Sequence, residues 1–588
     1  MPSLLDNKGT DAPTPASTDV TTDSATNLTT NAPSNATTDA PTDDPVLNIT
    51  ETPTAAPTHN FTMYTIDDFL AETISHNGAL YDVGTPQNKA MEALLNTSSA
   101  LDPNSVNDQI EIIQRYALNT LYFATNGEDW EVNDGWTSEG HPCGFKNENE
   151  EAEDNWHGIL CDDDLIIVEK ITLEKNGLRG MVPSEIKGLV QLVRFDVSDN
   201  QISGTLTPAI GELEDLSVLD INTNFFTGTI PTTIGNLTSI KLLDASSNFF
   251  SGTLATEVGQ LKDLVTFHVD SNFLSGTLSS ELFSMTDLVS IRMDNNQFSG
   301  SFPTEIGQLS KAIFMSFSQN SLTGTIPEEL GLNGDLEFFN ATANFIGGRL
   351  PDIFEDLFYL KTFDMALNFL TGSLPETFFA NSSVLERLDL HGNTLGEELF
   401  LQDGLGQMTT LQVLDLSTNL FLGTIPQAIG EMTKLTELRL DKNLLTGAVP
   451  ANLSQLSDIE ILSLSENILT TLPPDLTDLF RLKELQLSTN YFEEIPKEYF
   501  NDFPSLEILN VSRNEFEVDT LPDVFLSKSL KIMDLSFNNL NATFNISTLL
   551  GLDQVENLHM ADCSISSSLP DEISTLQSLV TIDSDNRF

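Results

Sequence analysis

The chain of 588 residues has little positive charge: 26 Lys and Arg stand against 87 Asp and Glu, and the formal net charge is −61. Binding to nucleic acid or to anionic lipid needs a cationic protein surface, so this charge excludes both classes of partner. The acidity favours cations, basic protein surfaces or neutral polymers as partners, and it carries no information about the fold.

Cysteine and long apolar runs are also scarce. Three cysteines are too few for a disulfide-stapled scaffold, and none has the Cys-x-x-Cys or Cys/His spacing that predicts zinc. No apolar run exceeds four residues, so we expect no transmembrane segment in this chain. The first six residues lack the basic and apolar regions of a signal peptide.

Residues 1–60 are dominated by Thr, Pro, Ala, Asp and Asn. Such a segment has too little apolar surface to offset the entropy of ordering its backbone. Thr together with Pro is also typical of O-glycosylated stalks. We expect a disordered stalk or linker here, with a plain disordered tail as the alternative.

Residues 61–167 are expected to form a compact helical N-terminal cap. Thr85 and Pro86 predict the start of a helix, as the N-cap and the first helical residue. A second helix is predicted from Ile110 to Leu121, where apolar residues recur at three- and four-residue spacing, and it should end at Asn126. Three tryptophans and two cysteines follow it.

From residue 168 to residue 588 the sequence repeats itself. An asparagine recurs every 24 residues at first and then every 23 to 26 residues, and a cysteine takes its last place. These 17 repeats predict a solenoid, because one short repeat cannot cover its own apolar side. The recurrent positions are Asn176, Asn200, Asn224, Asn248, Asn272, Asn296, Asn320, Asn344, Asn368, Asn393, Asn419, Asn443, Asn467, Asn490, Asn514, Asn538 and Cys563.

The repeat over residues 216–231 illustrates what each coil is built to do. Leu219 and Ile221 are two residues apart, so both point to the same side of a short strand. Asn224 can turn the chain and bond to buried backbone groups between coils. Gly228 permits a backbone turn before the proline that stiffens the return path. The expected class is an α/β repeat solenoid with a long, open surface rather than a compact pocket.

The frame of these repeats, LxxLxLxxNxLxGxIP, resembles the leucine-rich repeat family. Its Gly-x-Ile-Pro half is similar to the plant type found in receptor-like kinase ectodomains and polygalacturonase-inhibiting proteins, with good matches at residues 226–231, 322–327 and 421–426. The repeats cover over two thirds of the chain. The resemblance implies a right-handed superhelix or horseshoe, with short parallel strands on its concave face, and binding without chemistry.

Residues 121–161 are similar to the N-terminal cap of that family, although an acidic insert from Lys146 to Asp154 breaks the usual short Cys-x-Trp spacing. The resemblance implies a disulfide between Cys143 and Cys161, which requires an oxidising compartment. Two free cytosolic thiols are the alternative. Cys563 replaces a recurrent asparagine, and we expect it to be a buried structural residue.

No catalytic constellation is present in the sequence. It has no HExxH, GxSxG or P-loop motif and no kinase motif set, and its seven histidines are scattered. Acidic pairs such as Asp43 and Asp44 lack the alternating ligands of a calcium loop. We therefore expect no enzyme activity, no cofactor and no metal site.

Twelve Asn-x-Ser/Thr sequons occur, a number close to chance for this composition. Asn236 and Asn452 share one position of the repeat, away from the strands, where a glycan would be harmless. Asn381 is the third candidate for glycosylation.

Binding specificity should lie in the outward strand residues, which the core does not dictate. One outward position is Asp in six of the eleven repeats from residue 196 to residue 439, and we interpret these aspartates as a solvated ladder. The ladder breaks in repeats 5 to 8, where His268 and Arg292 replace Asp and apolar residues take nearby outward positions. Arg and aromatic side chains on an exposed face are the usual anchors of an interface. Individually tolerated exposed residues or self-association are the alternatives, and a glycan on Asn340 would shield Phe338. The predicted ligand-binding residues are His268, Asp270, Arg292, Asp294, Ile313, Phe314 and Phe338.

The first functional hypothesis is a non-enzymatic extracellular recognition module, either a receptor-type ectodomain or a secreted binder or inhibitor. Its ligand would be a protein, a peptide or a glycan. A structural or adhesive glycoprotein of a cell wall or matrix is the second hypothesis, and a cytosolic scaffold is the third. The chain stops a few residues into an eighteenth coil without a polar terminal cap. We interpret it as a piece of a longer protein, with a membrane anchor or a kinase outside it, at the cell surface or in the extracellular space.

Overall fold

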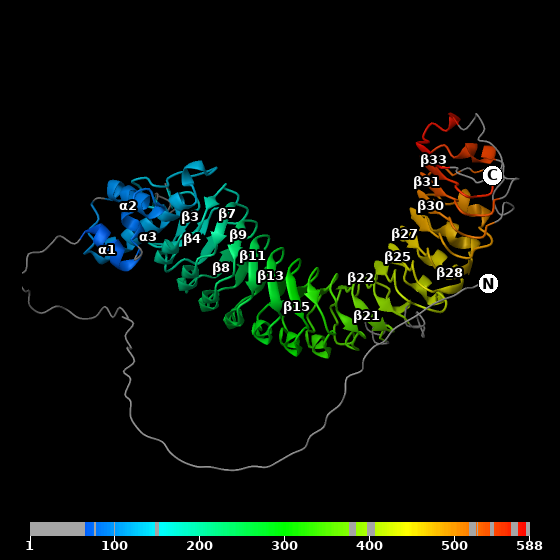
Figure 1. Ribbon diagram of the computed structural model, residues 1–588, viewed down its shortest axis with the longest axis horizontal. Helices are drawn as coiled ribbons and strands as arrows, with labels where there is room; N and C mark the ends of the chain where they lie inside the picture. Colours follow the sequence, from blue (N-terminus) through cyan, green and yellow to red (C-terminus); the bar gives the residue numbers. More distant parts are fainter. Residues whose placement is uncertain are drawn as a thin grey trace, which may run out of the picture. The chain divides into compact units, whose positions relative to one another are not determined.

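The computed structural model describes residues 65–75, 78–98, 100–146, 152–153, 155–375, 384–396, 406–516, 525, 527–540, 546–565 and 574–583. The predicted stalk, residues 1–60, and the sequon at Asn381 lie outside these residues. Residues 63–588 form one compact unit. Within this unit the coils follow one another along an arc (Figure 1).

Three α-helices open this unit: α1 (Ile66–Thr73), α2 (Pro86–Thr97) and α3 (Val106–Ala124). Both predicted helices are confirmed as α2 and α3. Thr85 caps α2, since its hydroxyl accepts a hydrogen bond from the Asn88 N–H at 3.1 Å.

The first helix was not predicted, because its eight residues hold only two turns of apolar pattern. A capping box at Thr65 and Asp68 starts it, and it buries Ile66, Phe69 and Leu70. In the described part of the chain, no helix is long and apolar enough to cross a bilayer.

Aromatic rings and a disulfide hold the segment between α3 and the first coil. The Trp136 ring lies 4.9 Å from the Trp130 ring and 5.4 Å from the Trp156 ring, measured between centroids. Cys143 and Cys161 form the disulfide that the resemblance implies, with their Cα atoms 5.7 Å apart. The acidic insert leaves this bridge intact and contains a short antiparallel pair, β1 (Phe145–Lys146) and β2 (Ala152–Glu153).

A ribbon of 19 short strands forms the body of the solenoid. The pairings run in one line from β3 to β33; β3 and β4 are antiparallel, and every later pair is parallel. The strands are β3 (Ile159–Cys161), β4 (Val168–Thr172), β6 (Arg194–Asp196), β8 (Val218–Asp220), β10 (Leu242–Asp244), β12 (Thr266–His268), β14 (Ser290–Arg292), β16 (Phe314–Ser316), β18 (Phe338–Asn340), β20 (Thr362–Asp364), β22 (Arg387–Asp389), β24 (Val413–Asp415), β25 (Glu437–Arg439), β27 (Ile461–Ser463), β29 (Glu484–Gln486), β30 (Ile508–Asn510), β31 (Ile532–Asp534), β32 (Asn557–His559) and β33 (Thr581–Asp583).

The coil of β8 follows the pattern predicted from its sequence. Leu219 and Ile221 are fully buried, while the residues on either side of Leu219 face outward. The left-handed backbone turn lies at Thr223, with φ +51°, rather than at the recurrent asparagine. Gly228, at φ +75°, supplies the second turn as expected.

The recurrent asparagines form a buried ladder that joins successive coils. The Asn224 amide donates to the Val197 carbonyl of the preceding coil at 2.8 Å, and its Oδ1 accepts from the Ile202 N–H at 2.9 Å. Cys563 is buried at the last place of the ladder, as predicted, and its thiol donates to the Leu535 carbonyl at 3.2 Å. Burial raises the pKa of this thiol to about 11, so it remains protonated and unreactive.

The Gly-x-Ile-Pro half of the repeat contains structure that the sequence reasoning missed. Short 3₁₀ helices follow this half in many coils, and a second set of parallel strands precedes them. The second set comprises β5 (Arg179–Gly180), β7 (Gln201–Thr205), β9 (Phe225–Gly228), β11 (Phe249–Thr253), β13 (Phe273–Thr277), β15 (Gln297–Gly300), β17 (Ser321–Leu322), β19 (Gly347–Gly348), β21 (Phe369–Gly372), β23 (Thr394–Leu395), β26 (Thr446–Ala448) and β28 (Ile468–Thr471).

Candidate functional site

The parallel register of the main sheet places equivalent residues of successive coils side by side. In the three-residue strands of the main sheet from β6 to β32, the middle side chain enters the core, and the first and third lie on the concave side, where the third is buried in several coils. Residues 24 positions apart in the sequence therefore become neighbours on this face, as Asp244, His268 and Arg292 do.

His268 is held by the coils on both sides of it. Its Nε2 lies 2.9 Å from the Ser290 hydroxyl, and its Nδ1 lies 3.4 Å from a carboxylate oxygen of Asp244. Burial alone would raise the pKa of Asp244, but hydrogen bonds from His268 and Ser246 outweigh it, and the pKa lies below its ordinary value. The His268 imidazole is therefore part of a local network that fixes its orientation.

Three of the predicted residues form one contact cluster, which we call the arginine–phenylalanine cluster: Arg292, Phe314 and Phe338. The Phe314 and Phe338 rings stack with centroids 4.2 Å apart and an interplanar angle of 4°. The Arg292 guanidinium carbon lies 4.6 Å from the Phe314 ring centroid, within the range of a cation–π contact. The cluster lies on the concave face, with Arg292 exposed and both rings half-buried.

The other three predicted residues lie outside this cluster and differ in their surroundings. Ile313 precedes β16 and is 40% exposed, so it extends the apolar surface. The Asp294 carboxylate accepts hydrogen bonds from the Ser318 N–H and hydroxyl, both at 2.7 Å, and therefore supports the next coil. Burial and two neighbouring carboxylates raise the pKa of Asp270. A binding role for all seven residues stays a prediction.

The aspartate ladder is not solvated as the sequence suggested. Asp196 and Asp389 are only 2% and 7% exposed, and Asp364 is also buried. Several of these carboxylates bond to the residue two positions later; Asp196, for example, accepts from the Ser198 N–H and hydroxyl at 3.2 Å and 2.8 Å. The aspartates therefore help to fix the turn after each strand, which explains their recurrence.

Asp220 is the member of this ladder for which we predict a measurable effect of pH. Burial and then the charges of Asp196 and Asp244 raise its pKa from 3.8 to about 6, although Asn222 donates hydrogen bonds to it. Between these two pH values the folded chain keeps a proton that the unfolded chain releases, so stability falls as pH rises through this window.

Asp220→Asn is expected to raise the free energy of unfolding at pH 7 by about 1–2 kcal/mol, because one pKa unit corresponds to about 1.4 kcal/mol and water screens part of the charge. It should also flatten the pH dependence between pH 4 and 6. Urea unfolding at several pH values measures both effects. Asp244→Asn is the control, and it should destabilise the chain at pH 7 because it removes the contact with His268. Equal effects of the two variants would contradict the prediction.

An exposed aromatic stripe on the second set of strands was missed from the sequence. Phe225, Phe249 and Phe273 are each nearly half exposed, and their rings pack in sequence with centroids 5.9 Å and 6.1 Å apart. Phe345 and Phe369 occupy the same position in two later coils, and their ring centroids are 6.0 Å apart. The sequence feature that could have predicted this stripe is the apolar residue directly after the recurrent asparagine.

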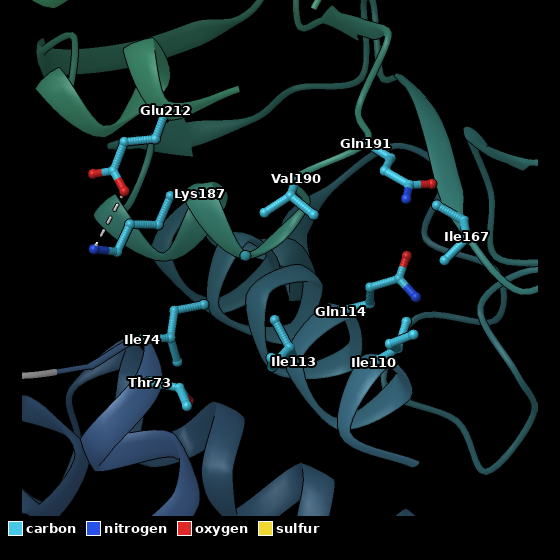
Figure 2. Close-up of a pocket in the computed structure, with 11 residues that line it drawn as sticks. Thr73, Ile74, Ile110, Ile113, Gln114, Ile167, Lys187, Val190, Gln191 and Glu212 are labelled. Atoms are coloured by element: carbon cyan, nitrogen blue, oxygen red, sulfur yellow. Dashed lines mark ion pairs between the residues drawn. The ribbon is translucent and has the colours of Figure 1, made fainter. Parts of the chain in front are cut away.

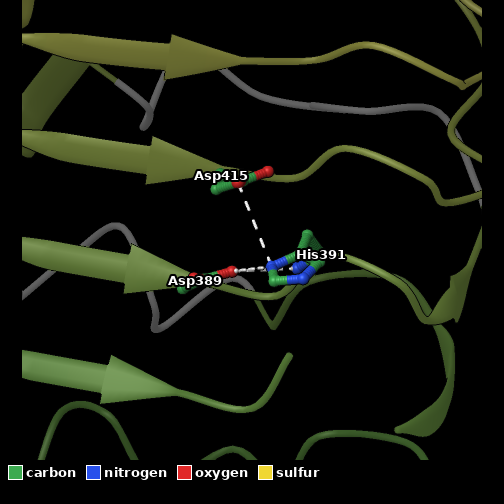
Figure 3. Close-up of side chains that lie close together, drawn as sticks. All are labelled: Asp389, His391 and Asp415. Carbon is green, nitrogen blue, oxygen red and sulfur yellow. Dashed lines mark hydrogen bonds and ion pairs between the residues drawn. The ribbon is translucent and has the colours of Figure 1, made fainter. Parts of the chain in front are cut away.

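A second missed feature is a compact group of Asp389, His391 and Asp415 on the concave face (Figure 3). One ligand atom from each residue lies within 4.8 Å of the others. The sequence feature that could have predicted this group is a histidine two residues after β22, where most other coils carry a small polar residue.

A pocket of about 330 Å³ lies between the cap and the first coils (Figure 2). Ile74 and Ile113 line it, together with Val190. Its polar groups are already engaged: the Gln114 side chain bonds to the backbone at both of its ends, and Lys187 lies 3.7 Å from Glu212. We interpret this pocket as a boundary between packed elements rather than a binding site, because Gln114, Lys187 and Glu212 are already engaged with one another or with the backbone.

The predicted glycosylation positions lie away from the main sheet where they are described. Asn236 ends the 3₁₀ helix η5 (Thr232–Asn236) and is exposed, and Asn452 lies in η12 (Ala451–Gln455). Asn340, by contrast, ends β18 on the concave face, and its Oδ1 accepts a hydrogen bond from the Thr342 N–H at 2.9 Å. Glycan occupancy at all of these positions stays a prediction.

Comparison with known proteins agrees with this architecture. Two family models match the chain: Leucine rich repeat at residues 480–540, and Leucine Rich Repeat at residues 215–237 and 410–432. No curated protein matches it.

Several solved structures share the fold. The plant peptide hormone receptor RGFR1, in complex with RGF2, is 25% identical with a TM-score of 0.59, and the match covers 73% of this chain and 79% of that chain. A TDR receptor is 26% identical with a TM-score of 0.53, covering 71% and 84%. A leucine-rich repeat protein of Leptospira interrogans is 26% identical with a TM-score of 0.52, covering 68% and 92%. Residues 215–237, 410–432 and 480–540 thus match leucine-rich repeats, and the fold of the chain is similar to that of a plant peptide hormone receptor.

Proposed function

We propose that this chain is a non-enzymatic recognition module of the extracellular space, which binds a protein, peptide or glycan ligand on the concave face of its main sheet. It would act as a receptor-type ectodomain or as a secreted binder or inhibitor. The observation that carries the proposal is the arginine–phenylalanine cluster, Arg292, Phe314 and Phe338, on an open surface.

The physical properties of this cluster suit the anchor of an interface. Arg and aromatic side chains dominate the energetics of protein interfaces, since they combine a large apolar area with a directional polar group. The stack of Phe314 on Phe338 restricts both rings before any ligand arrives, which reduces the entropy lost on binding. Ile313 adds exposed apolar surface at the edge of the cluster.

Among the three ligand classes, a peptide or protein is the best supported. The receptor RGFR1, which shares 25% of its aligned residues with this chain, is described as a peptide hormone receptor and was solved with RGF2 bound. An extended peptide can follow a ribbon of parallel strands across several coils, so each coil contributes one or two contacts.

The disulfide supports a location outside the cytosol. The bond between Cys143 and Cys161 is expected to persist only in an oxidising compartment. The similarity to RGFR1, which is described as a plant peptide hormone receptor, supports the same location. A cytosolic scaffold would require both thiols to be reduced.

The alternative function is a structural or adhesive glycoprotein of a wall or matrix. The formal charge of −61 favours it, because divalent cations can bridge acidic chains. Clustering that depends on divalent cations, without a local binding hot spot, would support this alternative.

Removal of the two stacked rings is expected to weaken ligand binding by roughly 30-fold or more, since hot-spot side chains contribute about 2 kcal/mol or more. Peptides selected from a random display library against the chain provide the ligand, and calorimetric titration compares the parent chain with Phe314→Ala and Phe338→Ala. The loss should change little with salt, because it comes from apolar contact. Phe249→Ala is the matched control: its ring is also exposed and stacked, but it lies on the second set of strands.

Two results would contradict this proposal. One is an equal loss of affinity in Phe249→Ala, which would move the binding surface away from the concave face. The other is a glycan on Asn340, detected by tandem mass spectrometry of its glycopeptide, because a glycan there would shield Phe338 from a ligand.

A further inference from the structure

Three side chains with metal-ligating atoms converge on the concave face, well beyond the arginine–phenylalanine cluster in the order of coils. Asp389 and Asp415 end the adjacent strands β22 and β24 and are partners in the parallel register. His391 follows β22 by two residues, and its ring turns back toward both carboxylates (Figure 3). The His391 Nδ1 lies 2.7 Å from the Asp389 Oδ1 and 4.0 Å from the Asp415 Oδ2.

Each carboxylate is held by hydrogen bonds and presents an oxygen to the imidazole. The Asp389 Oδ2 accepts a hydrogen bond from the Arg387 guanidinium at 2.7 Å, while Oδ1 accepts from the His391 N–H at 3.2 Å and faces the His391 ring. The Asp415 Oδ1 accepts from the Ser417 N–H at 2.9 Å and the Ser417 hydroxyl at 2.6 Å. Such outer hydrogen bonds orient metal ligands, because they fix which oxygen is presented to the ion.

The charge of this region favours a cation. Arg387 is shared between two carboxylates, since its Nε also lies 3.1 Å from Asp364. Arg439 is the register partner of Asp415, and its guanidinium is paired with Glu437. Two arginines, Arg387 and Arg439, therefore stand against four carboxylates, and a formal negative charge remains when the imidazole is neutral. The side chains of Asp389 and Asp415 are only 10% and 13% exposed, so water screens this charge less than it would on an open surface.

We propose that Asp389, His391 and Asp415 form a binding site for a divalent transition-metal ion of the Zn²⁺ class. One imidazole nitrogen and two carboxylate oxygens are ligands that Zn²⁺ accepts at about 2.0–2.2 Å, which places tetrahedral ligand atoms about 3.3–3.5 Å apart. The ligand atoms present, separated by 2.7 Å to less than 4.8 Å, bracket that spacing. Small rotations of the side chains would complete the geometry.

The donor set also discriminates among cations. Ca²⁺ takes six to eight oxygen ligands and gains little from an imidazole, whereas an imidazole with two carboxylates suits Zn²⁺ and its transition-metal neighbours. Three protein ligands leave a fourth position, and it opens toward the concave face. A carboxylate, imidazole or thiolate of a bound molecule could occupy that position, so the site would add metal-dependent recognition. The inference does not depend on the proposed function.

The test is a calorimetric titration of the full chain, without an affinity tag, with a zinc salt. We expect one high-affinity ion per chain, and we expect Ca²⁺ at equal concentration to leave its uptake unchanged. His391→Ser introduces the residue that eight other coils carry at this position and should weaken zinc binding at least about tenfold. Asp415→Asn should have a similar effect, and its remaining oxygen can still accept the bonds from Ser417. Far-UV circular dichroism checks that both variants are folded.

His268→Ser is the matched control. His268 also lies beside a ladder carboxylate, Asp244, but it belongs to no group of three metal-ligating residues in the described part of the chain. Zinc binding should be unchanged in this variant. The inference fails if the parent chain takes up no zinc at a single site, or if His391→Ser and Asp415→Asn bind zinc as the parent does. It also fails if His268→Ser weakens binding as much as His391→Ser.

Discussion

Asn320→Ala is expected to lower the free energy of unfolding by about 3–5 kcal/mol, because it leaves several buried backbone groups without a partner. The Asn320 amide donates to the Met293 carbonyl of the preceding coil at 2.9 Å and to the Phe317 carbonyl at 3.1 Å. Its Oδ1 accepts from the Phe298 N–H at 2.9 Å. Alanine can satisfy none of these groups, and water cannot easily reach them in a closely stacked core.

Native-state hydrogen exchange can locate this effect, because coils contact only their neighbours and stability is largely a sum of local terms. The Phe298 amide should exchange much faster in Asn320→Ala, together with amides of the adjoining coils. Coils far along the ribbon should keep their protection. Uniform acceleration along the whole ribbon would contradict this local account.

Asn320→Cys is the matched control for the loss of the amide. The chain itself carries a cysteine at the last place of the ladder, where the Cys563 thiol donates to the Leu535 carbonyl at 3.2 Å. A cysteine at position 320 should therefore recover part of the stability that alanine loses. A cysteine variant no more stable than the alanine variant would mean that volume, rather than hydrogen bonding, determines the role of the ladder.

The backbone of this fold could be predicted from the sequence because the period constrains it at many points. Leu219 and Ile221, two residues apart and repeated in the next coil, leave one side of the strand to be buried. The side chain of Asn224 was expected to point into the core, because the buried carbonyls at the turn need a hydrogen-bond donor. The period also placed Phe314 beside Phe338, because residues at matching positions of successive coils must become neighbours. Arg292 is the register partner of Ser316 and reaches the Phe314 ring diagonally.

What the sequence could not give were the interactions that depend on side-chain direction. The sheet register brings Asp389 beside Asp415, but only the turn after β22 aims the His391 ring back at them. The burial of the aspartates was also missed, because the same Asp fits a solvated surface or a closed turn. Phe249 lies in a second strand of its coil, and the Gly-x-Ile-Pro pattern does not predict that strand or the exposure of the ring.

Phe338 and Phe339 are adjacent in β18. Alanine at position 339 is expected to reduce mainly the stability, and alanine at position 338 mainly the affinity for a ligand. Phe339→Ala should lower the free energy of unfolding by about 3–5 kcal/mol, because it empties a fully buried site. The ring of Phe339 lies 5.6 Å from that of Phe363 and 6.1 Å from that of Phe302, measured between centroids. A cavity at this place therefore loosens the contact between neighbouring coils.

Phe338→Ala should change the stability by less than about 1 kcal/mol, since its half-buried ring mainly contacts Phe314 on the concave face. Urea unfolding of both variants, together with Phe339→Leu, measures the difference; leucine should recover most of the stability because it refills the site. Binding of a selected peptide should show the reverse order, with affinity reduced in Phe338→Ala and retained in Phe339→Leu. If Phe338→Ala proved as destabilising as Phe339→Ala, the concave rings would be part of the core. Phe338 would then be a core residue, and the proposal that it contacts a ligand would lose its main support.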